Sequence, residues 1–100
     1  MAELEAVVAA KGWALKKNFR SSWCSFSAEN GRVAFGVALG KGNIPYLYIK
    51  RVQSEANRFP AKLLTYNETY DQAEFALDPG AANLETFLPL LSLAYSRISK

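Results

Sequence analysis

The sequence predicts an α+β domain in which an antiparallel sheet packs against a C-terminal helix. Three observations lead to this class: a hairpin signal at Asn30-Gly31, short runs rich in aromatic and β-branched residues between turns, and an apolar stripe at helical spacing near the C-terminus. The 100 residues are 50% hydrophobic and 21% charged, which is typical of one folded domain. Because the chain contains neither internal repeats nor a linker, we expect a single domain over residues 1–100.

The first half of the chain predicts one helix and three strands. Residues 2–11 place Leu4, Val7 and Val8 on one side of a helix that Gly12 ends. Asn30-Gly31 predicts a type I′ turn, which requires positive φ at both residues, between strands at residues 21–28 and 32–39. A second turn centred on residues 41–42 leads to a third strand at residues 44–51.

The second half predicts a short helical segment, two strands and the longest helix. Residues 52–59 fit one or two helical turns, ended by Pro60. Residues 62–66 and 72–77 predict strands around a polar turn, and residues 84–98 predict a helix capped by Asn83 and kinked at Pro89. The expected order is therefore α-β-β-β-(α)-β-β-α.

Turn positions also assign side chains to the two faces of the sheet. A centre at Asn30-Gly31 pairs Phe26 with Phe35, and a centre at residues 41–42 pairs Val37 with Tyr46. The resulting core face comprises Cys24, Phe26, Val33, Phe35, Val37, Leu39, Ile44, Tyr46 and Tyr48. The second face comprises Trp23, Ser25, Ser27, Ala34, Gly36, Ala38, Pro45, Leu47 and Ile49, and it is too apolar for a plain solvent surface.

Apolar residues that one core does not use predict a protein-binding surface. On the last helix, Leu93 falls opposite the stripe that suits the core, and Leu90 falls on its flank. We therefore expect contact with a partner protein, or self-association as a dimer, through Trp23, Leu47, Ile49, Leu90 and Leu93.

The charge distribution leaves a nucleic-acid-binding module as the alternative. Residues 6–67 hold ten Lys or Arg and two acids, a balance of +8, whereas residues 68–85 hold five acids and no base. Such asymmetry is typical of a surface for nucleic acid or an acidic partner, although solvated charged faces give the same pattern. The candidate phosphate contacts are Lys16, Lys17, Arg20, Lys41, Lys50, Arg51 and Arg58.

The residue inventory argues against an enzyme. The chain has no histidine, so histidine-dependent triads and zinc sites are excluded, and the single cysteine, Cys24, is expected in the core. We expect no catalytic residue, metal or cofactor. The acidic start of the chain and its short apolar runs predict neither a secretory signal nor a membrane span, so a cytoplasmic location is expected.

Several short segments carry a resemblance to known families. Lys11-Gly12-Trp13 follows the first helix, Asn30-Gly31 forms the hairpin, Ala56-Asn57 precedes the fourth strand, and Leu84-Glu85 starts the last helix. With the order of elements, these segments resemble the type III secretion chaperone fold and its YbjN-like relatives. The stretch at residues 46–50, Tyr-Leu-Tyr-Ile-Lys, is similar to the Leu-Tyr-Leu-Lys strand of the N-terminal domain of TfoX competence regulators. Either resemblance implies a non-catalytic binding module.

Overall fold

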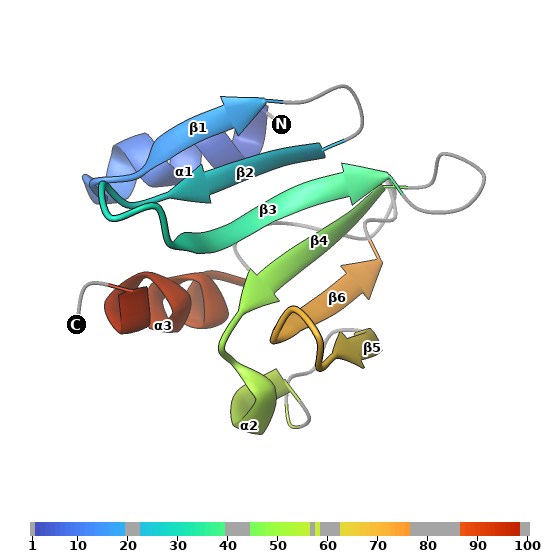
Figure 1. Ribbon diagram of the computed structural model, residues 1–100. Helices are drawn as coiled ribbons and strands as arrows, with labels where there is room; N and C mark the ends of the chain where they lie inside the picture. The colour runs from blue at the N-terminus through green and yellow to red at the C-terminus, as the bar shows by residue number, and fades with distance from the viewer. Residues whose placement is uncertain are drawn as a thin grey trace.

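A computed structural model describes residues 2–19, 23–39, 45–56, 58, 63–76 and 87–98 (Figure 1). Its elements are α1 (Ala2–Lys11), β1 (Lys16–Phe19), β2 (Trp23–Ser27), β3 (Val33–Leu39), β4 (Pro45–Lys50), α2 (Gln53–Ala56), β5 (Leu63–Asn67), β6 (Gln72–Ala76) and α3 (Leu88–Ile98). The six strands form one antiparallel sheet in the order β1-β2-β3-β4-β6-β5. The expected α+β class, with the C-terminal helix on an antiparallel sheet, is confirmed.

Strand β1 was not predicted from the sequence. Its residues, Lys-Lys-Asn-Phe, have little β-propensity and no alternation of apolar and polar residues. The strand nevertheless pairs with β2, from Lys16 opposite Ser27 to Phe19 opposite Cys24. It lies at the edge of the sheet, where lysines discourage pairing with another chain. Its sequence therefore suits the edge position.

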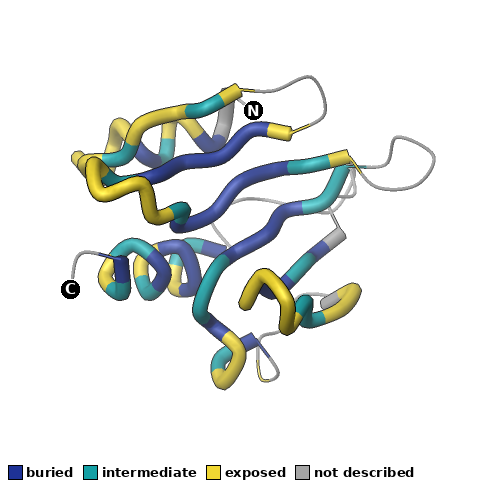
Figure 2. Tube along the Cα trace, viewed as in Figure 1, coloured by how far each residue is buried: buried dark blue, intermediate teal, exposed yellow. Residues whose placement is uncertain are grey.

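One face of the sheet carries the hydrophobic core. Leu4 and Val8 of α1 and Leu91 and Ile98 of α3 join one cluster with inward side chains of the strands, among them Phe35. Figure 2 shows the burial concentrated along the middle strands and on the sides of α1 and α3 that meet the sheet. Both long helices therefore cover the same face. No helix in the described part of the chain is long and apolar enough to span a membrane.

The local turns explain how the chain enters and leaves these elements. Gly12, at a φ of 65°, ends α1 as expected. The N–H of Gly12 donates to the carbonyl of Ala9, and the N–H of Trp13 donates to the carbonyl of Val8, which together form a Schellman motif. Between β2 and β3, Ala28 pairs with Arg32, and the N–H of Gly31 bonds back to the carbonyl of Ala28. Only Gly31 has positive φ, so the hairpin is a type I turn with a glycine bulge, and the expected type I′ turn is wrong.

The register of β2 and β3 agrees with the prediction from Trp23 to Phe26, but a bulge after Phe26 pairs Ser27 with Val33 and shifts the turn end by one residue. The register of β3 and β4 is shifted by one residue throughout. Phe26 lies opposite Phe35, but Val37 lies opposite Leu47 where Tyr46 was expected. The predicted turn centre at residues 41–42 and the core position of Ile44 lie outside the described residues. Because side chains alternate, a one-residue shift exchanges the faces of the whole strand.

Helix α3 also differs in its orientation. Its buried side is formed by Leu90, Leu91, Ala94 and Ile98, so Leu90 lies in the core and not on a flank. Pro89 is the second residue of the helix, where its missing N–H has no intrahelical acceptor, so it removes no hydrogen bond within Leu88–Ile98 that would cause the expected kink. The predicted start at residue 84 and the cap at Asn83 fall outside the described residues.

A polar contact holds α2 against α3. The guanidinium of Arg97 donates to both carboxylate oxygens of Glu55, each at 2.9 Å, and to the carbonyl oxygen of Arg51. This pairing raises the pKa of Arg97 and lowers that of Glu55. Helix α2 is a single turn, the shorter of the two lengths expected, and it buries Ala56.

Candidate interaction surface

The second face of the sheet carries none of the described helices. Cross-strand pairing brings Trp23, Ala38 and Tyr46 into one row across β2, β3 and β4. The neighbouring row consists of Ser25, Gly36, Tyr48 and Glu74. Small side chains on β3 therefore lie between the bulkier residues of β2 and β4. We call these two rows the uncovered face.

Tyr48 lies across the glycine of the second row. A Cβ placed on Gly36 would lie 2.6 Å from Cζ of Tyr48 and closer still to its hydroxyl and to the carbonyl oxygen of Cys24. The Tyr48 hydroxyl donates to that carbonyl at 3.4 Å. Burial raises the pKa of Tyr48 to about 12. The tyrosine thus covers the backbone that the glycine leaves open, and it is buried without a helix above it.

Lys50 continues the same side of β4. Its ammonium lies 5.9 Å from the ring centre of Tyr48 and 5.5 Å from that of Tyr70, and it donates to the carbonyl oxygen of Tyr70 at 2.9 Å. Burial, and after it the charge of Arg51, lowers the pKa of Lys50. The side chain is therefore held by the protein's own aromatic groups.

Exposed apolar residues gather at one end of β1, β2 and β3. Phe19 ends β1, Trp23 begins β2 and Leu39 ends β3, and these three are 68%, 39% and 43% exposed. Pairing of Phe19 with Cys24 and of Trp23 with Ala38 shows that they share this end of the sheet. Because side chains alternate along a strand, Phe19 and Leu39 point to the covered side, with Cys24 and Val37, and Trp23 points to the uncovered side.

Of the five predicted interface residues, only Trp23 lies on this surface. Leu47 and Ile49 are fully buried, because the shifted register points them into the core, so their predicted place on the second face is wrong. Leu90 is buried as well, since the core side of α3 is centred on Leu90 and Leu91. Leu93 is half-buried and packs against the core.

The seven predicted phosphate contacts do not converge either. Lys17 pairs with Glu5 of α1 at 2.5 Å, and Arg51 donates to the carbonyl oxygen of Val33 at 2.9 Å. Lys16 and Lys50 lie on the uncovered side but on different strands, β1 and β4. Arg58 is exposed beyond α2, and Arg20 and Lys41 lie outside the described residues.

Folding also offsets the charge asymmetry of the sequence. The N–H of Arg51 bonds to the carbonyl of Asp71, which brings the basic end of β4 beside the acidic turn between β5 and β6. The charges of Asp71 and Glu74 act on Lys50 and raise its pKa against the larger effects of burial and Arg51. Lys50 and Arg51 therefore have acidic neighbours, as Lys17 has in Glu5.

Cys24 lies in the core, as predicted, with no exposed surface. Burial raises the pKa of its thiol, which disfavours the reactive thiolate. Among the described residues, no three Cys, Asp or Glu side chains come together in a group that would hold a metal ion.

Tyr46 and Tyr48 are the residues of the uncovered face that the sequence reasoning placed on the core face. Residues 46–50 alternate Tyr, Leu, Tyr, Ile and Lys, and aliphatic residues are buried more often than tyrosine or lysine. Taken without the assumed turn centre at residues 41–42, that alternation places Leu47 and Ile49 on the core face of the sheet. It was the signal that could have identified the uncovered face.

Comparisons with protein-family models, with curated proteins and with solved structures give no match.

Proposed function

We propose that the protein is a non-catalytic binding module that associates with a second copy of itself through the uncovered face around Trp23. The observation that carries the proposal is the row of Trp23, Ala38 and Tyr46, in which two aromatic residues flank a small one. Tryptophan and tyrosine dominate the energetics of many protein interfaces, because they bury a large area at little conformational cost.

The profile of this row supports self-association. In a dimer with two-fold symmetry the same patch meets itself, so a bulky residue must face a gap. Trp23 or Tyr46 of one copy would fill the space above Ala38 of the other. A non-catalytic role of this kind agrees with what either family resemblance implies.

Light scattering across a range of protein concentrations tests the proposal. We expect the mass of a dimer for the native chain and of a monomer for Trp23→Glu, because a buried charge opposes association. Leu64→Glu is the matched control: Leu64 is also exposed, at 52%, but lies on β5 at the opposite edge of the sheet. The control should still dimerise, and neither change should alter the melting temperature by more than a few degrees.

Two results would contradict the proposal. A native chain that stays monomeric at millimolar concentration would exclude a useful self-interface. Equal loss of association in Trp23→Glu and Leu64→Glu would show that the contact is not centred on the uncovered face.

Nucleic-acid binding is the second candidate function, favoured by one observation. Lys50 lies between the rings of Tyr48 and Tyr70 on the same side of β4 as Tyr46, and base stacking beside a cation needs such a combination. Titration with single- and double-stranded oligonucleotides at about 50 mM salt tests it, since phosphate contacts weaken steeply as salt rises. We expect weak binding or none, because Lys50 is engaged within the protein. Tight, salt-sensitive binding that is lost in Lys50→Gln would favour this candidate over the first.

A further inference from the structure

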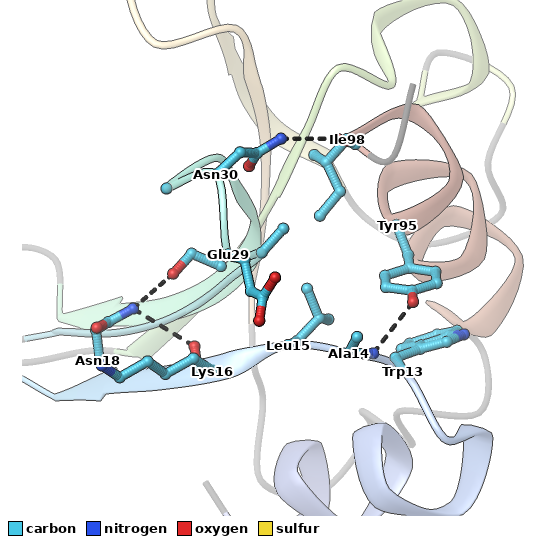
Figure 3. A pocket seen from close by; sticks show the side chains of 12 residues that line it. Trp13, Ala14, Leu15, Lys16, Asn18, Glu29, Asn30, Tyr95 and Ile98 are labelled. Carbon is cyan, nitrogen blue, oxygen red and sulfur yellow. Dashed lines mark hydrogen bonds between the residues drawn. The ribbon is translucent and has the colours of Figure 1, made fainter.

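A hollow of about 1000 Å³ lies at the other end of β2 from Trp23 (Figure 3). Three separate parts of the chain enclose it: the segment from Trp13 to Lys16, the turn between β2 and β3, and the last turns of α3. Because β2 rises about 3.3 Å per residue, Glu29 in this turn lies about 20 Å from Trp23. The hollow is therefore distinct from the surface around Trp23.

The walls of the hollow are held in place by contacts between these parts. The rings of Trp13 and Tyr95 stack with their centres 5.3 Å apart, and the Tyr95 hydroxyl accepts a hydrogen bond from the N–H of Ala14 at 3.1 Å. On the opposite side, the Asn30 amide donates to the carbonyl oxygen of Ile98 at 3.3 Å. The turn and the helix end are thus fixed to one another before any ligand arrives.

The polar lining of the hollow holds one carboxylate, Glu29, and one ammonium, Lys16, beside the amides and hydroxyls of Asn18, Ser27, Asn30 and Tyr95. The Glu29 carboxylate reaches from the turn toward Leu15 (Figure 3). Within the described ranges, the two ion pairs, Lys17 with Glu5 and Arg97 with Glu55, do not involve Glu29, and Lys16 lines the hollow without pairing to it. The C-terminal end of α3, which carries a partial negative charge, also opens here at Ile98.

The remaining lining is apolar and aromatic. Leu15 and Ile98 flank the carboxylate, and Tyr95 faces it across the hollow. A cationic head with an apolar stem complements the Glu29 carboxylate and this apolar lining. Arginine has both, and its planar guanidinium can donate two parallel hydrogen bonds to one carboxylate and stack on an aromatic ring.

We propose that this hollow binds an arginine side chain of a partner polypeptide, with the guanidinium on the Glu29 carboxylate and the stem against Leu15 and Ile98. The site does not depend on the self-association proposed above. It is a second contact point, at the opposite end of the same strand, and it is selective for a cationic side chain.

The test uses Nα-acetyl-arginine N-methylamide as the probe and the amide and indole signals of the ¹⁵N-labelled protein as the readout. We expect saturable shifts of Trp13, Ala14 and Gly31 in the millimolar range. The corresponding citrulline compound has nearly the same shape but no charge, and it should bind at least about tenfold more weakly. Equal shifts with citrulline would overturn the proposal, because recognition would then not involve the carboxylate.

Variants locate the charge that recognises the probe. Glu29→Gln keeps the size of the side chain and should weaken arginine binding about tenfold or more. Glu68→Gln, in the exposed turn between β5 and β6, removes the same charge elsewhere and should leave binding unchanged. If both variants bind like the native chain, or if the blocked lysine compound binds as tightly as arginine, the assignment is wrong.

The outcome can be separated from that of the proposed self-association. Trp23→Glu should leave arginine binding unchanged, because Trp23 does not line the hollow. Glu29→Gln should likewise leave the mass in solution unchanged.

Discussion

The covered and uncovered faces of the sheet are stabilised in different ways, and β4 contributes to both. On the covered face, Leu47 and Ile49 are enclosed between the sheet and helices and have no exposed surface. On the uncovered face, Tyr46 and Tyr48 rest on the sheet itself, with ring centres 6.4 Å apart. The first face is buried by other elements, and the second by the neighbouring strands.

This difference shows how an open sheet can shield its backbone without a second layer. Tyr48 covers Gly36 and shields Ser25, so the middle of the uncovered face is well buried. Toward the end of the sheet the same face exposes Trp23. Intramolecular packing therefore buries Tyr48, whereas Trp23 keeps 39% of its surface exposed.

The largest effect should come from truncating a residue on the covered face. Leu47→Ala should lower the free energy of unfolding by about 3 kcal/mol, because it removes buried methyl groups and leaves a cavity. Tyr46→Ala, at the adjacent position on the uncovered face, should cost about 1 kcal/mol or less. Urea unfolding of the two variants measures the contrast. Equal costs would show that the shifted register of β4 is wrong.

A smaller loss should follow from a methyl group added under Tyr48. In Gly36→Ala the new Cβ would meet the carbonyl oxygen of Cys24, which is backbone and yields little, as well as the Tyr48 ring. We expect a loss of about 2 kcal/mol in the free energy of unfolding. Ala38→Gly, two residues along on the same face, serves as the control. It creates no clash and should cost about 1 kcal/mol or less through chain entropy.

The part of the fold that local signals determine was predictable. The helix Ala2–Lys11, the pairing of Phe26 with Phe35 and the buried position of Cys24 follow from helical spacing, from the glycine that ends the helix, and from the Asn30-Gly31 turn. Each depends on residues close together in the sequence. The type of turn was not predicted, because only Gly31 takes the positive φ that both residues tolerate.

The part that depends on contacts between distant segments was not predictable in the same way. The register of β4 was inferred from a presumed turn centre, and an error of one residue exchanged Tyr46 with Leu47. The face of α3 depends on where the helix starts and on what it packs against, so Leu90 was misplaced. The candidate site follows the same division: Trp23 was placed correctly by the first hairpin, whereas the tyrosines beside it were not.

The smallest of the predicted effects concerns the ionisation of Tyr48 at high pH. Burial raises its pKa from 10, the value expected in the unfolded chain, to about 12 in the fold. The folded protein therefore favours the neutral phenol. This contribution to stability is fully present below pH 10 and is lost as the pH rises toward 12.

The expected loss of stability at pH 11, relative to pH 9, is about 1 kcal/mol. At pH 11 the unfolded chain, with a pKa of 10, has largely ionised its tyrosine, whereas the folded protein, with a pKa of about 12, has not. Unfolding measured at both pH values, in the native chain and in Tyr48→Phe, isolates the effect, since the phenylalanine cannot ionise and all other groups stay the same. The variant should lose less stability than the native chain over this interval. If both lose the same amount, Tyr48 ionises as freely as an exposed tyrosine, and the uncovered face is more open to water at its centre than its packing against Gly36 indicates.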